Sequence, residues 1–261
     1  MMQIFVGKNS LLFCLLSFVL FMAFIEVGYA FGLRYAKKYP SRESWGGGAI
    51  EAAVLALFGL LLAFTFAAAQ GRLEERRKLI AQEANAIGTA YLRLDLLPSH
   101  EREFLKGKFR EYLDARLRAY EALPDLKKAY EELQGSEQLQ KQIWSEAQAA
   151  VRREVWQPAA ILLLPALNEM IDITTLRTMI AKSHTPSVVF LLLYVVGMIT
   201  AVVSGFGMAK TPGRNWLHRW VFALVVSLTL YVILDLEFPR LGLIRLDAAD
   251  QTLIQLRESM N

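Results

Sequence analysis

Long apolar runs alternate with charged stretches along this chain. An α-helix needs about 20 mostly apolar residues to cross about 30 Å of hydrocarbon. Runs that reach this length cover residues 10–31, 50–70, 186–209 and 216–236. The pattern therefore predicts an all-α integral membrane protein with four transmembrane helices and an extramembrane helical domain.

The first apolar run follows Lys8 and could be mistaken for a signal peptide. It is longer than a signal h-region, and no small-x-small cleavage site ends it. We interpret it as a retained transmembrane helix, with signal cleavage as the alternative. Glu26 lies inside this run, about one helical turn from the expected interface, where we expect its side chain to snorkel to the surface.

The second apolar run continues into an amphipathic pattern. No proline occurs between its start and Pro98, and apolar residues such as Leu73, Ile80 and Ile87 recur at helical spacing. We predict one continuous helix over residues 50–97, about 70 Å long at about 1.5 Å per residue.

The middle of the chain is densely charged but nearly neutral, because residues 72–185 hold 18 Lys+Arg and 17 Asp+Glu. Apolar stripes predict helices on both sides of Pro124, with a short charged helix ending near Gln134 and another starting at Gly135. The apolar run 155–167 contains two prolines and is too short to cross a membrane, so we expect a buried or re-entrant segment.

These elements divide the chain into four parts. Residues 1–71 form transmembrane helices 1 and 2, and residues 72–185 form the charged extramembrane helical domain. Residues 186–236 form transmembrane helices 3 and 4, and residues 237–261 form a C-terminal tail. Lys and Arg flank both faces of the predicted spans, so the positive-inside rule leaves the orientation open.

Composition and motifs argue against several classes of function. The net charge of +4 comes from dispersed basic residues with acidic neighbours, which argues against nucleic-acid binding. His100, His184 and His218 are scattered, without carboxylates or cysteines at metal-ligand spacing. No phosphate-binding loop or nucleophile elbow is present. We therefore expect no metal, no cofactor and no enzymatic activity.

Three stretches carry a family resemblance. They are 59-GLLLAFTFAAA-69 with 82-QEANAIGTAYLRLDLLP-98, then 167-LNEMID-172, and 234-LDLEFPRLGLIRLD-247. Together they resemble the bacterial bestrophin-like membrane proteins, distant relatives of the bestrophin anion channels. The resemblance implies a multi-pass protein of the bacterial inner membrane and a homo-oligomer, pentameric as in bestrophins. It also implies a pore for small anions lined by the second transmembrane helix. The acidic calcium-clasp run of animal bestrophins is missing.

Two faces of the second span are candidates for this pore. Phe58, Leu62 and Phe66 recur at i, i+4 and i+8, the spacing at which a bestrophin-like neck carries its apolar rings. The alternative is that they are ordinary core or lipid-facing residues. Small residues form a second face that permits close packing with neighbouring subunits. They are Ala52, Ala56, Gly59, Ala63 and Ala67.

A polar stripe follows this span. Asn85, Thr89 and Arg93 are spaced to line an aqueous vestibule, with Arg93 attracting anions, or to form an ordinary solvated or inter-helix face. Asn168 and Asp172 are four residues apart and share a helix face. We expect them to form a polar network that contacts the stripe.

Two carboxylates end the fourth span. Asp235 and Glu237 need an interface or a partner this close to hydrocarbon, and we expect Arg240 or Arg245 to pair with them. The competing function is a non-conducting membrane scaffold or regulator whose charged domain binds a partner protein. A second helix whose stripes are buried inside one subunit would favour that alternative.

Overall fold

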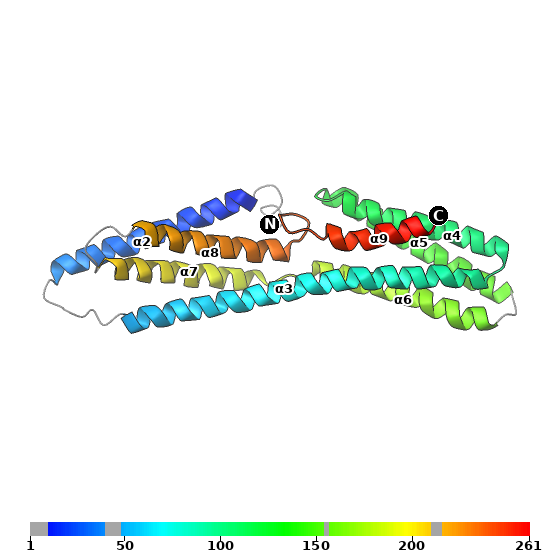
Figure 1. The fold of residues 1–261 in the computed structure, drawn as a ribbon, viewed down its shortest axis with the longest axis horizontal. Coiled ribbons are helices and arrows are strands. Elements are labelled where there is room, and N and C mark those ends of the chain that lie inside the picture. The colour runs from blue at the N-terminus through cyan, green and yellow to red at the C-terminus, as the bar shows by residue number, and fades with distance from the viewer. Residues whose placement is uncertain (1–9, 40–47, 154–156, 210–215) are drawn as a thin grey trace. The chain divides into compact units, whose positions relative to one another are not determined.

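The computed structural model describes residues 10–39, 48–153, 157–209 and 216–261 (Figure 1). Helices account for nearly all of these residues, and no strand occurs among them. The elements are α2 (Ser10–Lys38), α3 (Gly48–Arg93), η1 (Leu94–Leu96), α4 (Ser99–Glu121), α5 (Leu126–Arg153), α6 (Gln157–Lys182), α7 (Ser187–Met208), α8 (Trp216–Glu237) and α9 (Asp247–Ser259).

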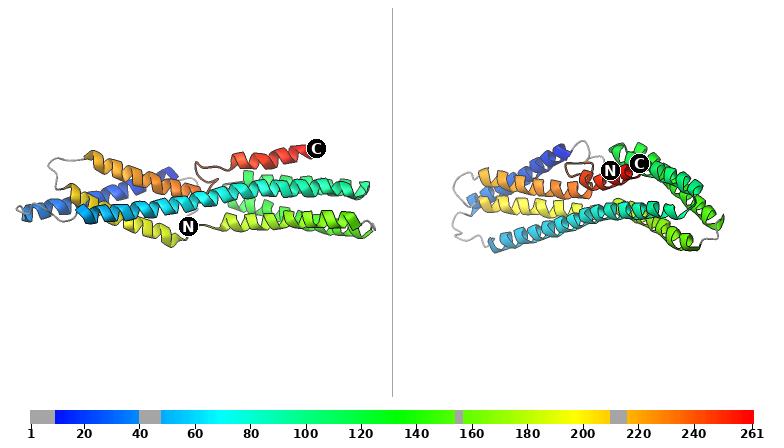
Figure 2. Two further views of the ribbon diagram at one scale, coloured as in Figure 1. Left: turned by 60° about the horizontal axis from the view of Figure 1, so that its bottom comes forward. Right: turned by 45° about the vertical axis from the view of Figure 1, so that its right-hand side comes forward.

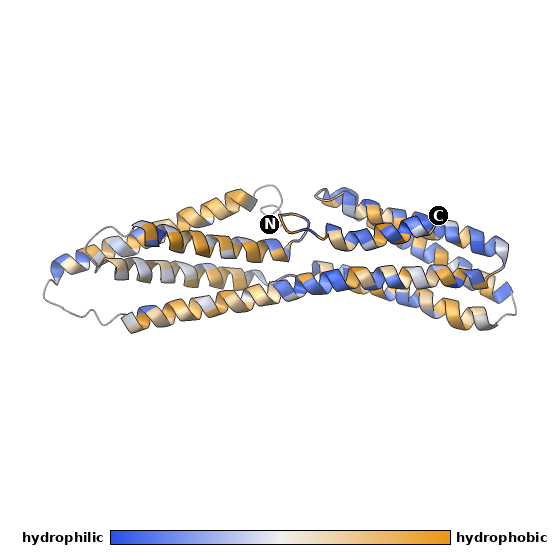
Figure 3. Cartoon of the chain, in the orientation of Figure 1, coloured by the Kyte–Doolittle hydropathy of each residue, from blue (hydrophilic) through white to orange (hydrophobic). Residues whose placement is uncertain are grey.

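The structure confirms the all-α class and the four apolar spans. Four segments are long and apolar enough to cross a membrane. They are Leu11–Lys38, Gly48–Leu96, Ala159–Met208 and Trp216–Glu237. The third combines α6 and α7, which are separate helices. In Figure 3, α8 and the first half of α3 are mainly apolar, whereas polar residues are frequent in the second half of α3.

The predicted long helix is confirmed, because α3 runs for 46 residues without a break. A second expectation was wrong, since α5 passes through Gly135 as one helix. Glycine inside a helix costs only about 1 kcal/mol relative to alanine. Burial of Ile143, Ala147 and Ala150 on the same helix offsets that cost.

The chain forms two compact units. The membrane unit comprises residues 1–72 and 184–243, and the helical unit comprises residues 73–183 and 244–261. Because α3 crosses residue 72, its apolar half belongs to the membrane unit and its polar half to the helical unit.

In the membrane unit, α2, α7 and α8 lie side by side (Figure 2). Glycines allow α2 and α7 to approach closely. A Cβ added to Gly28 would overlap the carbonyl oxygen of Val202, and one added to Gly205 would overlap that of Ile25. The apolar core beside this contact contains Phe21, Ile25, Phe58, Leu193, Ala201, Ala223, Val226 and Leu230.

In the helical unit, α4 packs against α5, and α5 packs against α6. The C-terminal helix α9 lies on α4, where Arg257 Nε donates to Asp114 Oδ1 at 2.7 Å. The carbonyl of Met260 accepts hydrogen bonds from Tyr91 Oη at 3.0 Å and from Arg110 Nε at 2.8 Å. The end of the chain is therefore fixed to α3 and α4.

Candidate functional site

The predicted constriction residues on α3 have three different environments. Phe58 is 2% exposed and belongs to the core of the membrane unit together with Phe21, and the tip of its ring lies beside Gly197. Leu62 is half-buried beside that core, and Phe66 is 41% exposed. Phe58 therefore fills a space inside its own chain, which does not fit a side chain directed at a pore axis.

The predicted small-residue face of α3 is uncovered. Ala52, Ala56, Gly59, Ala63 and Ala67 are all exposed in the single chain. A Cβ added to Gly59 would meet no atom within 4 Å among the described residues. This face is therefore available to lipid or to another copy of the chain.

The polar stripe and the α6 network meet in one open groove of the helical unit. The groove has a volume of about 760 Å³, and its lining includes Asn85 and Thr89 from α3 and Asn168 and Asp172 from α6. Asn168 Nδ2 donates to Asp172 Oδ2 at 2.8 Å. With Glu169, the groove holds two carboxylates. The structure thus brings together residues that are about 80 positions apart in sequence.

Arg93, the third member of the stripe, has a local partner. Its Nη1 donates to the carbonyl oxygen of Leu162 at 2.6 Å. The guanidinium therefore joins the end of α3 to the start of α6, and it is not among the residues that line the groove.

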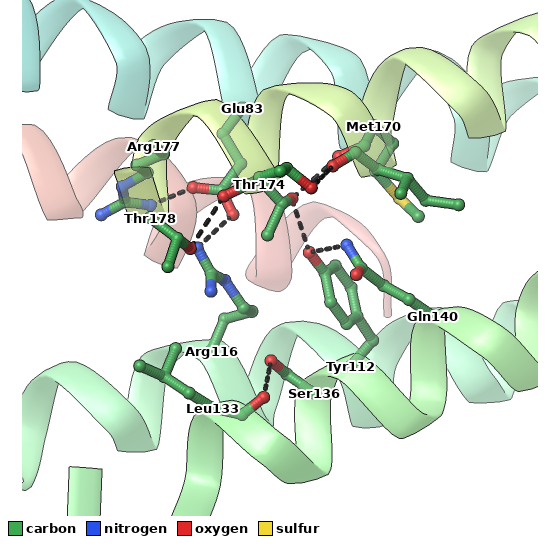
Figure 4. A network of polar contacts seen from close by, with 12 residues as sticks. Glu83, Tyr112, Arg116, Leu133, Ser136, Gln140, Met170, Thr174, Arg177 and Thr178 are labelled. Atoms are coloured by element: carbon green, nitrogen blue, oxygen red, sulfur yellow. Dashed lines mark hydrogen bonds and ion pairs between the residues drawn. The ribbon is translucent and has the colours of Figure 1, made fainter. Parts of the chain in front are cut away.

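A buried charge cluster occupies the core of the helical unit (Figure 4). Glu83 of α3 is fully buried and forms ion pairs with Arg116 of α4, at 2.7 Å, and with Arg177 of α6. Asp250 of α9 lies 3.8 Å from Arg177. The ring of Tyr120 lies against both guanidinium groups. Two acidic and two basic side chains from four helices therefore meet in one place.

The cluster stabilises its own charges. Burial alone would raise the pKa of Glu83, but Arg116 and Arg177 outweigh that effect and hold its pKa below the ordinary value. Burial raises the pKa of the neighbouring Tyr112 to about 12. Tyr112 is neutral at ordinary pH, and its hydroxyl lies 3.0 Å from Gln140 Nε2 and 3.2 Å from Thr174 Oγ1.

Glu237, the last residue of α8, contacts α3 and the segment before α7. Glu237 pairs with Arg72 of α3 and accepts hydrogen bonds from Thr185 Oγ1 at 2.5 Å and Thr185 N at 3.2 Å. Arg72, as a partner of Glu237, was not predicted from the sequence. Arg245 lies 4.0 Å from Asp247.

Asp235 closes the turn after α8. Its carboxylate accepts the Leu243 N–H at 3.1 Å. A Cβ added to Gly242 would overlap Asp235 Oδ1, so only glycine allows this approach. Arg240, at the centre of the turn, adopts a left-handed backbone with φ 98°. The conformation is that of a structural turn held by a buried carboxylate.

Sequence analysis missed Arg219 and the role of Arg116. Both are charged residues that fall on apolar helical stripes, Arg219 before Ala223 and Val226, and Arg116 after Phe109 and Tyr112. A charge at such a position indicates a buried ion pair, and this signal was present in the sequence. Arg219 pairs with Glu26, which the sequence analysis expected to snorkel.

The geometry defines a multi-pass, all-α membrane protein with a charged helical unit. The profile of the bestrophin-like domain matches residues 47–250, so the chain belongs to the bestrophin-like family. No curated protein matched the sequence.

Solved structures agree with this assignment at the level of the fold. The chain is similar to crystal structures of variants of a bacterial bestrophin homologue from Klebsiella pneumoniae. One shares 15% identity over 97% of this chain and 98% of the other, with a TM-score of 0.68. Another shares 15% identity over 94% and 97%, with a TM-score of 0.64. At this identity the likeness shows a common fold.

Proposed function

We propose that this protein is an oligomeric bestrophin-like channel of the bacterial inner membrane, which conducts anions through a pore lined by α3. One observation carries the proposal. Only 11% of the most apolar window of the α3 segment is buried, against 56% for α8. The apolar half of α3 therefore lies at the edge of its unit, where copies of the chain can meet.

The side of α3 that can reach a symmetry axis lies opposite Phe58. An α-helix turns about 100° per residue, so Leu60 lies about 200° around the helix from Phe58. Ala56 and Phe64 lie on the same side as Leu60. Leu60 is 50% exposed and Phe64 is 64% exposed. We therefore assign the constriction to Ala56, Leu60 and Phe64, in place of the ridge that starts at Phe58.

Symmetry turns this line into rings. Each copy in a closed oligomer presents the same residues to the axis, so Leu60 and Phe64 would form two stacked apolar rings. Apolar rings conduct only when they are wide enough to stay wet. Beside this line, the exposed small residues Ala52, Gly59 and Ala63 permit adjacent copies of α3 to pack closely.

The bestrophin resemblance and the charge of the groove in the helical unit favour permeant ions of opposite sign. Anions are what the bestrophin resemblance implies. The groove beside the polar half of α3 holds Glu169 and Asp172, which would attract cations if the groove opened onto the pathway. Ion selectivity must therefore be measured directly.

Reconstitution tests the proposal. The subunit number of the purified protein is first measured in mild detergent by light scattering, with the mass of the detergent subtracted. The protein is then inserted into liposomes, and its currents are recorded under a chloride gradient. We expect an oligomer whose reversal potential moves toward the chloride equilibrium potential. A monodisperse monomer contradicts the oligomer, and a shift toward the cation potential contradicts anion selectivity.

A second function is favoured by the surface of α6. Ile161, Leu162, Leu176 and Met179 are 43–68% exposed on a helix of the charged unit. Exposed apolar side chains outside a bilayer mark protein-binding surfaces. Burial of Phe58 inside one subunit also favours a function without conduction. A non-conducting scaffold whose helical unit binds a partner protein would show no current while remaining an intact oligomer.

A further inference from the structure

The first two turns of α8 attach to the membrane unit through one buried side chain. Among residues 216–222, only Arg219 is buried, with 1% of its side chain exposed. The next buried positions, Ala223 and Val226, belong to the apolar core. Apolar packing of α8 therefore begins at the end of the second turn, where Phe222 is partly buried against this core.

Arg219 reaches across to α2. Its Nη1 atom donates to Glu26 Oε1 at 2.6 Å, and its guanidinium lies 4.0 Å from the centre of the Tyr29 ring. Both partners lie on the stretch of α2 that Gly28 holds closely against α7. The half-exposed Trp220 adds one aromatic contact with Phe18, at 5.3 Å between ring centres. The ion pair is thus the main attachment of this end of α8.

The pair is incompletely satisfied. Nε and Nη2 of Arg219 are buried and have no hydrogen-bond acceptor among the described residues, whereas the Glu26 side chain is 44% exposed. Burying a guanidinium with free donors is costly, and apolar residues of similar volume usually stabilise such a contact at least as well. Stability alone therefore gives no reason for a charged pair at this position.

A charged pair differs from an apolar contact in that it can be released. Glu26 lies near the membrane surface, where water or another cation can compete for its carboxylate. Once the pair separates, no buried side chain holds residues 216–221 in place, and the contact of α8 with the apolar core starts only at Phe222. The apolar core from Ala223 onward stays intact, so the motion is confined to the end of the helix.

We propose that the Arg219–Glu26 pair is a releasable latch between α8 and α2. In the latched state the first two turns of α8 lie against α2, and in the released state they separate while the rest of the membrane unit keeps its packing. The latch does not depend on ion conduction, so it stands or falls separately from the channel proposal.

Pulsed electron paramagnetic resonance on the full-length protein in bilayers tests the latch. In a Cys14→Ser background, spin labels at Ala30→Cys and Leu217→Cys report the latched ends, since both positions are exposed. Labels at Leu16→Cys and Leu228→Cys report a matched control pair nearer the other ends of the same helices. Labelled protein is diluted with unlabelled protein to suppress distances between copies.

We expect Glu26→Gln to add a second, longer distance between the labels at positions 30 and 217, with no change in the control pair. The apolar combination Glu26→Leu with Arg219→Met should restore one narrow distance. An unchanged distribution in Glu26→Gln overturns the latch. Equal broadening of both label pairs overturns it as well, because the ion pair would then support the whole unit. A broad distribution in the apolar combination would show that this contact does not hold the helix end.

Discussion

The Oε1 atom of Glu83 lies 2.7 Å from Nη2 of Arg116, and both side chains are buried in the core of the helical unit. Arg177 approaches the same carboxylate from α6, and Asp250 of α9 lies beside Arg177. One carboxylate on α3 therefore links the long helix to α4 and α6 directly, and to the C-terminal helix through Arg177. Any movement of α3 in this unit must change these contacts.

Glu83→Gln should destabilise the helical unit strongly. The substitution keeps the shape of the side chain but leaves Arg116 and Arg177 buried without their central anion. Removing one partner of a buried ion pair costs about 3–5 kcal/mol in free energy of unfolding. Thermal or denaturant unfolding in mild detergent, followed by circular dichroism, measures this loss.

The matched control is Glu74→Gln, because Glu74 pairs with Arg77 at 3.7 Å on the surface of the same helix. An exposed pair of this kind contributes about 0–1 kcal/mol. Similar losses in the two variants would contradict the central role of Glu83.

The same carboxylate predicts acid sensitivity. Its pKa in the folded protein lies below the ordinary glutamate value of 4.5, so its ionised form contributes stability above that pH. The contribution disappears as pH falls through the lowered folded pKa. We expect the stability of the native protein to decrease below pH 4.5 more steeply than that of Glu83→Gln. Parallel pH curves for the two proteins would assign the acid sensitivity to other groups.

Gly28→Ala and Gly205→Ala should each loosen the contact between α2 and α7, because the added Cβ overlaps a backbone carbonyl of the facing helix. Overpacking of this kind costs about 1–3 kcal/mol. Gly59→Ala is the control, since its Cβ enters open space within the chain. Thermal midpoints of the three purified variants in one detergent make the comparison. A lower thermal midpoint in Gly59→Ala alone would contradict this prediction. It would mean that the close helix contact lies between copies of the chain and not between α2 and α7 of one copy.

Hydropathy and helical spacing were sufficient to predict the helices. Four apolar runs gave the four spans, and the absence of proline before Pro98 gave the long α3. Gly135 misled the prediction because a single glycine weakens a helix by less than tertiary packing stabilises it. The predicted boundary at Gly135 was wrong because tertiary packing, and not the local sequence, determines the length of α5.

Pairings between distant residues were harder to predict. Glu83 meets Arg116 and Arg177 across wide gaps in sequence, and Arg219 meets Glu26 across a still wider one. Helical spacing places each of these charges on an apolar stripe, but it does not say which residue lies opposite. The same limit explains why Phe58 was grouped with Leu62 and Phe66. Periodicity defined the ridge, and only the fold showed that Phe58 points into the core.

Modification of single cysteines along α3 tests the central claim most directly. In a Cys14→Ser background, Leu60→Cys and Phe58→Cys are reconstituted separately in liposomes, and ion flux is measured before and after a charged, thiol-reactive reagent. We predict that the reagent reduces flux through Leu60→Cys and leaves flux through Phe58→Cys unchanged. Block of Phe58→Cys without block of Leu60→Cys would contradict the assigned pore face, and intact oligomers without flux would contradict the channel itself.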